Sequence, residues 1–298
     1  MNRPESEHRP MQPAGRAGVF SGRTEHTHGW RARLELGYAP RAGRTIPIHR
    51  RHIGPLLVQR PFHPEGEVCH TYLLHPPAGI VQGDALEFQV EAAAGAHALV
   101  TTPGAGKFYR STGGEAHVVQ RFHVTDGAAY EWLPQETILY AGSHARLETH
   151  VTLEGSARYL GWEIVCLGRP AADERFDEGR LVQRLGVERD GRPLLHEQLV
   201  LDGGSAQLVG IWGMQAQPVT ATLLCTADFS AARSEALCTA AGEPLTGMGG
   251  ITVVDGLLVA RYLGPQARHA REWFVRLWTV LRPEVFGREA CVPRIWAT

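Results

Sequence analysis

Lysine is almost absent from this 298-residue chain, in which Lys107 is the single exception among 30 basic residues. The other basic residues are arginines, and 31 acidic residues bring the formal net charge to −1. A protein that binds nucleic acid needs a basic surface that displaces counterions from phosphates. The balanced charge therefore argues against a nucleic-acid partner.

Long apolar runs and paired cysteines are also missing. The runs at 251–254 and 257–260 end far short of the roughly 20 residues that a membrane-spanning helix needs. The N-terminus lacks the apolar core of a secretory signal. Five scattered cysteines form no CxxC pair, which favours reduced thiols over a disulfide framework. We therefore expect a cytoplasmic protein that does not interact with membranes.

The sequence divides into a tail and one domain. Residues 1–28 are rich in Arg, His, Gly, Pro and Ser and have no hydrophobic period, so we expect a disordered N-terminal tail. From Trp30 onward apolar residues alternate with charged ones, which is typical of a half-buried strand. We expect residues 29–298 to form a single domain.

Short segments with strand character recur along this domain and are separated by turn residues such as Asp-Gly. We expect strands at 30–36, 68–74, 86–90, 98–102, 117–124, 129–133, 146–153, 158–167, 181–187, 194–201, 219–226 and 257–263. Many short strands indicate a mainly β fold. The pattern alone does not separate a sandwich, a barrel and an irregular solenoid.

Two helices are expected near the C-terminus. Ser230 can cap a helix that ends at about Ala241, before Gly242 and Pro244. The second begins near 265, carries an apolar stripe at 274, 277, 278 and 281, and is expected to end before Pro283.

The glycine-rich segment 103–108 resembles a phosphate-binding loop only superficially. A Walker A loop has Ser or Thr after its lysine, whereas Phe108 follows Lys107 and no clear helix comes next. We interpret the segment as a turn between two strands. Nucleophile-elbow and HExxH motifs are also absent, so the motifs give no support for an enzyme.

Two groups of residues have the chemistry of metal ligands. On the strand at 68–74, alternation places Cys69 and His75 on one face and His70 on the other. Asp84, Glu163 and Glu197 lie in apolar segments, where a carboxylate must be paired, hydrogen-bonded, exposed or functional. Possible partners for these carboxylates are Arg169, Arg180 and Arg184.

Six ordered blocks carry a resemblance to a known family. They are HIGPLLVQRPF (52–62), HPPAGIVQGD (75–84), TPGAGKFYRS (102–111), EWLPQETI (131–138), CLGRP (166–170) and PRIWAT (293–298). In this order and spacing they resemble the urease accessory protein D (UreD, or UreH) family, over roughly residues 29–298.

The resemblance implies a distorted β-helix, or β-solenoid, of many short strands with two helices toward the C-terminus. It also implies a non-catalytic scaffold that binds urease apoprotein and the accessory protein UreF, which recruits the GTPase UreG. Nickel(II) would pass through in transit, and no cofactor would be bound stably.

Within that resemblance the metal-ligand candidates gain a hypothesis. A nickel path of moderate affinity would use Asp84 first, then Glu163 and Glu197, together with Cys69, His70 and His75. Small residues at Gly104, Ala105 and Gly106 would keep a passage open beside Lys107, for which we expect a structural or partner-contact role. The alternative is an all-β hydrolase or lyase in which Asp84, Glu163 and His75 act as acid, base and orienting group.

Overall fold

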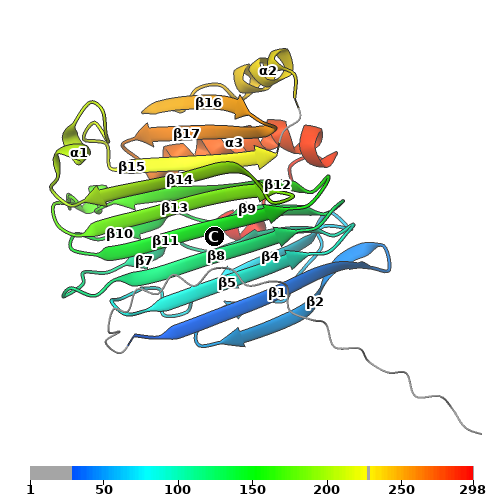
Figure 1. The fold of residues 1–298 in the computed structure, drawn as a ribbon, viewed down its shortest axis with the longest axis horizontal. Helices are drawn as coiled ribbons and strands as arrows, with labels where there is room; N and C mark the ends of the chain where they lie inside the picture. The colour runs from blue at the N-terminus through cyan, green and yellow to red at the C-terminus, as the bar shows by residue number, and fades with distance from the viewer. Residues whose placement is uncertain (1–28, 227–228, 298) are drawn as a thin grey trace, which may run out of the picture.

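The computed structural model describes residues 29–226 and 229–297, which form a β-solenoid of about four turns (Figure 1). The tail expected over residues 1–28 lies outside the described residues. Between residues 69 and 189, the strands of five or more residues alternate between two facing sheets, so that each turn of the chain adds one strand to each sheet. Toward both ends of the chain, consecutive strands stay within one sheet. The mainly β prediction and the solenoid implied by the family resemblance are both confirmed.

The two sheets differ in size but share a parallel central region. The seven-stranded sheet has the order β14 (Arg192–Asp202), β13 (Arg180–Arg189), β11 (His144–Leu153), β8 (Ala116–Val124), β5 (Ala85–Ala92), β1 (Arg31–Arg41) and β2 (Arg44–Ile53). The ten-stranded sheet has the order β16 (Met248–Val254), β17 (Leu257–Gly264), β15 (Val219–Thr226), β12 (Arg158–Leu167), β9 (Ala129–Leu133), β6 (His97–Thr101), β4 (Cys69–Leu74) and β3 (Leu57–Val58), with β10 (Thr137–Leu139) and β7 (Gly106–Phe108) joined to it beside β12.

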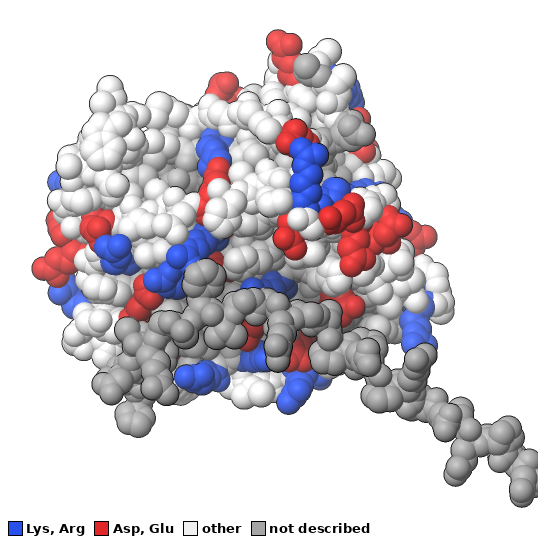
Figure 2. Space-filling model, viewed as in Figure 1, with Lys and Arg blue, Asp and Glu red and all other residues white. Residues whose placement is uncertain are grey.

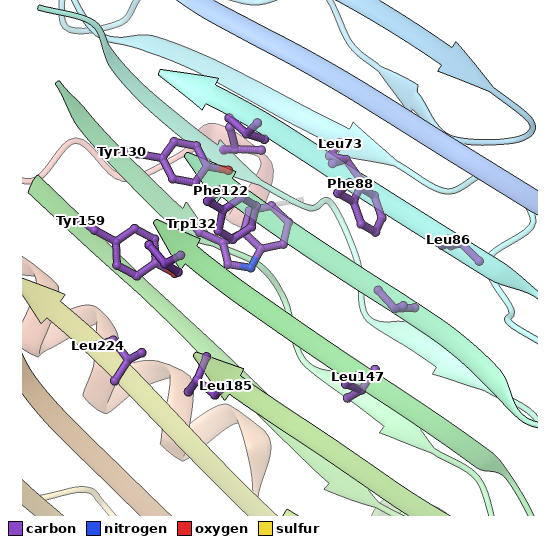
Figure 3. Packing of buried hydrophobic residues seen from close by; sticks show 14 of the residues in the cluster. Leu73, Leu86, Phe88, Phe122, Tyr130, Trp132, Leu147, Tyr159, Leu185 and Leu224 are labelled. Carbon is purple, nitrogen blue, oxygen red and sulfur yellow. The ribbon is translucent and has the colours of Figure 1, made fainter. Parts of the chain in front are cut away.

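The period of two in the sequence decides which side chains enter the space between the sheets. In β12, Tyr159 and Val165 pack against the seven-stranded sheet, whereas Trp162 and Ile164 pack on the opposite side, toward the C-terminal helices. Figure 3 shows the inter-sheet core, where the Phe122 ring lies 5.0 Å from the Tyr130 ring between their centroids. The molecule therefore has two apolar cores, one on each side of the ten-stranded sheet.

Helix α2 (Ala231–Ala241) begins as expected, because the Ser230 side chain accepts a hydrogen bond from the Arg233 backbone N–H. Helix α3 (Ala267–Phe286) lies against the outer face of the ten-stranded sheet (Figure 1). The prediction that this helix ends before Pro283 is wrong. Arg282 and Phe286 are buried on either side of the proline, and their packing holds the last turn in place until Gly287 ends it. No helix of the described residues is long and apolar enough to cross a membrane.

Several short elements had no clear sequence signal. Strand β2 has many exposed residues, and it forms by pairing antiparallel with β1 around a bulge at Gly37/Tyr38. Strand β16 likewise pairs antiparallel with its neighbour, β17. The remaining elements are the four-residue helix α1 (Ala206–Val209) and the 3-10 turns Pro170–Ala172 and Arg294–Ala297.

The interpretation of 103–108 as a turn needs correction. Residues 102–105 connect two strands, but Gly106–Phe108 form β7, which pairs in parallel with β10. Ile80 forms a further parallel bridge with Phe108. Since β10 also pairs with β12, these short segments belong to the ten-stranded sheet.

Candidate functional site

A cavity of about 270 Å³ lies between the two sheets, beside β7 and β10. His75, Gly104, Ala105, Gly106 and Glu163 are among the residues that line it. The fold thus brings together residues that are 88 positions apart in the sequence, from His75 to Glu163. Most of the remaining lining is apolar, so the few polar groups stand out.

Glu163 points into the space between the sheets from β12. Thr149 donates a hydrogen bond to one of its oxygens, and Gln183 Nε2 donates to the other at 2.5 Å. Both donors are uncharged and come from the seven-stranded sheet. Burial raises the pKa of Glu163, and these two hydrogen bonds oppose the shift only in part.

The arginines considered as partners for the carboxylates bind elsewhere. Arg169 pairs with Glu174, Arg180 pairs with Asp202, and Arg184 lies 3.4 Å from Glu148 between nitrogen and oxygen. Within residues 29–226 and 229–297, Glu163 has no ion pair. Its charge, when present, is balanced by hydrogen-bond donors alone.

Other buried polar atoms occur beside Glu163. In the part of the chain that the structure describes, Gln120 Oε1 and Trp132 Nε1 have no hydrogen-bond partner, and both residues line the cavity. Buried polar groups nearly always find a partner in protein or water. These two atoms and Glu163 therefore give the mostly apolar cavity a few polar groups that a water molecule or a hydrated ion can satisfy.

Asp84 has a largely structural environment. Its two carboxylate oxygens accept backbone hydrogen bonds from Trp30 (2.8 Å) and Val81 (2.9 Å). These bonds tie the start of β1 to the turn that precedes β5. Asp84 is also close enough to His75 to raise the pKa of that imidazole, although burial has the larger effect and lowers it. His75 accordingly has a neutral imidazole at pH 7, with one ring nitrogen that can bind a metal ion.

Cys69 and His70 point in opposite directions from β4, as alternation predicts. Cys69 belongs to the inter-sheet core, near the Thr71 hydroxyl, and burial raises the pKa of its thiol to about 11. His70 lies on the helix side of the sheet, where its Nε2 is 2.6 Å from Glu65 Oε1. Neither residue lines the cavity around Glu163.

Glu197 lies at the edge of the inter-sheet space. It sits opposite Leu185 in the β13–β14 ladder and forms an ion pair with Arg261 of β17. That pair joins β14, an edge strand of the seven-stranded sheet, to β17, the strand next to the edge of the ten-stranded sheet, and Figure 2 shows alternating blue and red side chains over this region. Glu197 is thus a charge-compensated residue outside the cavity.

The small residues beside the cavity leave room for larger side chains. A Cβ atom at Gly104 would meet nothing within 4 Å, and one at Gly106 would lie 3.7 Å from Thr137 Oγ1. Neither glycine has a positive φ. Lys107 belongs to β7, and its carbonyl accepts a hydrogen bond from Ile80.

Sequence reasoning missed a second charged cluster, on the helix side of the ten-stranded sheet. Arg282 of α3 is fully buried and donates to Glu131 and Glu65, while His97 lies 2.7 Å from Glu131. The available signal was an arginine four residues after Trp278, on the apolar stripe of the helix. An arginine at such a position requires a buried acidic partner.

Comparisons with known proteins agree with the family resemblance. The UreD urease accessory protein family matches residues 30–297. A urease accessory protein UreD from Azoarcus sp. is 50% identical over 272 residues, which cover 91% of this chain and 95% of the relative. The UreD protein from Dechloromonas aromatica is 47% identical over 278 residues, which cover 92% of this chain and 96% of the relative. The chain therefore belongs to the UreD family of urease accessory proteins.

Proposed function

We propose that this protein is a non-catalytic urease maturation factor that holds urease apoprotein and lets nickel pass through the inter-sheet cavity. The proposal includes binding to UreF, recruitment of UreG through UreF, and action in the cytoplasm without a stably bound cofactor. The names of the relatives support the maturation role. The observation that carries the nickel step is Glu163, an interior carboxylate that has no cationic partner among the described residues.

The environment of Glu163 suits an ion in transit. A carboxylate and a neutral imidazole are acceptable ligands for nickel(II), whereas thiolates would hold it more tightly. The raised pKa of Glu163 makes protons compete with the metal and thereby weakens binding. Cys69 remains a thiol because of its own raised pKa. The cavity therefore offers moderate affinity, which allows release as well as entry.

The geometry favours this function over the hydrolase or lyase alternative. In that alternative Asp84 would exchange a proton with substrate, but both of its oxygens already accept backbone hydrogen bonds. A general acid or base must be within hydrogen-bond reach of the reacting atom. Asp84 is instead committed to holding a turn.

The test is co-expression of Glu163→Gln with the urease subunits and the other accessory proteins. The substitution keeps the size of the side chain and its capacity to accept from Thr149, but it removes the charge. We expect urease nickel content and activity to fall severalfold, while pull-down shows the same complex as the unmodified protein.

Glu197→Gln is the matched control, because Glu197 is also on the inner face of a sheet but is paired with Arg261 outside the cavity. It should leave nickel content unchanged. Normal nickel loading with Glu163→Gln, or equal losses with both variants, would remove the proposed role of the cavity. Loss of the complex itself would instead indicate that Glu163 supports assembly.

A further inference from the structure

The C-terminal segment brings a thiol to the helix-side charged cluster. Ligand atoms of Glu65, His70 and Cys291 all lie within 4.8 Å of one another. Glu65 comes from the loop before β4, His70 from β4 itself, and Cys291 from the segment after α3. The His70 side chain is fully buried and that of Glu65 is 10% exposed, whereas Cys291 is partly buried. The three ligand atoms thus converge at a largely buried place beside the ten-stranded sheet.

Acidic and basic side chains are unequal in number around these three residues. Arg282 donates to Glu65 at 2.6 and 2.8 Å and to Glu131 at 3.1–3.2 Å, so one guanidinium faces two carboxylates. Apart from its histidines, the cluster thus has two acidic side chains for one basic side chain. A buried cluster with excess negative charge attracts a cation.

Cys291 makes the charge count fit a divalent metal ion. A metal ion of charge +2 that binds a thiolate adds a net charge of +1, which cancels the excess. The Cys291 thiol gives its proton to solvent, the N–H hydrogen of His70 moves to the ring nitrogen that does not bind the metal, and no electron is transferred. Carboxylate, imidazole and thiolate together are typical ligands of borderline ions such as zinc, cobalt and nickel, and not of magnesium or calcium.

We infer that Glu65, His70 and Cys291 form a binding site for a borderline divalent transition-metal ion. Arg282 retains Glu131 as its partner when the metal binds. The site is separate from the inter-sheet cavity, because β4 points Cys69 toward the cavity side and His70 toward the helix side. A metal ion here would fasten the segment after α3 to the ten-stranded sheet, which it also meets through Trp296 Nε1 and Thr101.

The experiment uses the full chain without a histidine tag, titrated with Co²⁺ under reducing conditions. Thiolate coordination gives a ligand-to-metal charge-transfer band in the near ultraviolet. We expect about one equivalent of Co²⁺ to produce this band, and Cys291→Ser to abolish it and weaken binding at least about tenfold. Cys238→Ser is the matched control, since Cys238 is also partly buried but lies on α2.

Several outcomes are decisive. Retention of the band in Cys238→Ser and in Glu163→Gln, together with its loss in Cys291→Ser, would support the site and separate it from the proposed nickel path. Absence of the band in the unmodified protein, or its persistence in Cys291→Ser, would overturn the inference. In that case the cluster serves only as a hydrogen-bonded connection between α3 and the sheet.

Discussion

Two glutamates on neighbouring strands of the ten-stranded sheet have opposite environments. Glu131 of β9 points toward α3 and meets Arg282, His97 and Trp278. Glu163 of β12 points into the inter-sheet cavity, where its hydrogen-bond partners among the described residues are the uncharged Thr149 and Gln183. Although burial opposes the shift, His97 and Arg282 lower the pKa of Glu131 to about 2, whereas burial raises that of Glu163. Charge compensation therefore distinguishes a carboxylate that stabilises the fold from one that is free to meet a cation.

The largest expected effect comes from removal of the compensating charge. Arg282→Met leaves Glu131 and Glu65 buried without their guanidinium. Breaking a buried ion pair from one side costs about 3–5 kcal/mol. We expect a decrease of this size in the free energy of unfolding, measured by urea denaturation.

Arg268→Met on the same helix provides the control. Arg268 is 77% exposed and pairs with Glu272 across one turn, so its loss should cost less than about 0.5 kcal/mol. Similar costs for the two substitutions would show that the buried cluster around Glu131 does not stabilise the fold.

A smaller effect on stability, but a large one on function, is expected at the cavity. Gly106→Leu should narrow the space beside Thr137 without backbone strain, because its Cβ has room and its φ is ordinary. We expect urease activation in co-expression to fall severalfold, while the free energy of unfolding changes by less than about 1.5 kcal/mol.

Gly250→Leu on β16 is the control for Gly106→Leu, since a Cβ there meets nothing within 4 Å and Gly250 does not line the cavity. If activation is normal with Gly106→Leu, nickel does not pass this part of the cavity.

The smallest effect concerns the pH dependence of stability. Glu131 has a folded-state pKa below its unfolded value, so its contribution is present above about pH 4.5 and is lost as the pH falls toward 2. The pH dependence of stability that arises from Glu163 has the opposite sign. The pKa of Glu163 is raised in the folded state, so stability is lost as the pH rises from the pKa of the unfolded state through that of the folded state.

Denaturation of the unmodified protein and of Glu163→Gln between pH 4 and 8 checks this difference in sign. Glu163→Gln should not show this loss of stability as the pH rises, and at pH 7 it should be at least as stable as the unmodified protein. A variant that is less stable at pH 7 than the unmodified protein would contradict the assignment of Glu163 as an uncompensated carboxylate.

Local patterns predicted much of the fold, because strand period and turn chemistry act over a few residues. β9, β12 and β15 have the expected bounds, and alternation correctly separates Cys69 from His70. Strands such as β2 depend on pairing with a neighbour and left no comparable pattern. The helix that continues past Pro283 depends on buried contacts of Arg282 and Phe286.

The candidate site could be predicted only in part. The sequence singled out Glu163 and His75, which share a cavity, but it did not distinguish them from Glu197, whose partner is 64 residues away. Glu131 and Arg282 are 151 residues apart. Pairs this distant follow from the winding of the solenoid and have no local signature.

The most direct test of the central claim measures stability and nickel delivery together in two variants, Glu131→Gln and Glu163→Gln. We expect Glu131→Gln to lower the free energy of unfolding by several kcal/mol, because it removes one of the two carboxylates that pair with Arg282. Glu163→Gln should keep the stability of the unmodified protein while urease matured with it contains severalfold less nickel. If urease contains as much nickel with Glu163→Gln as with the unmodified protein, Glu163 has no role in nickel delivery.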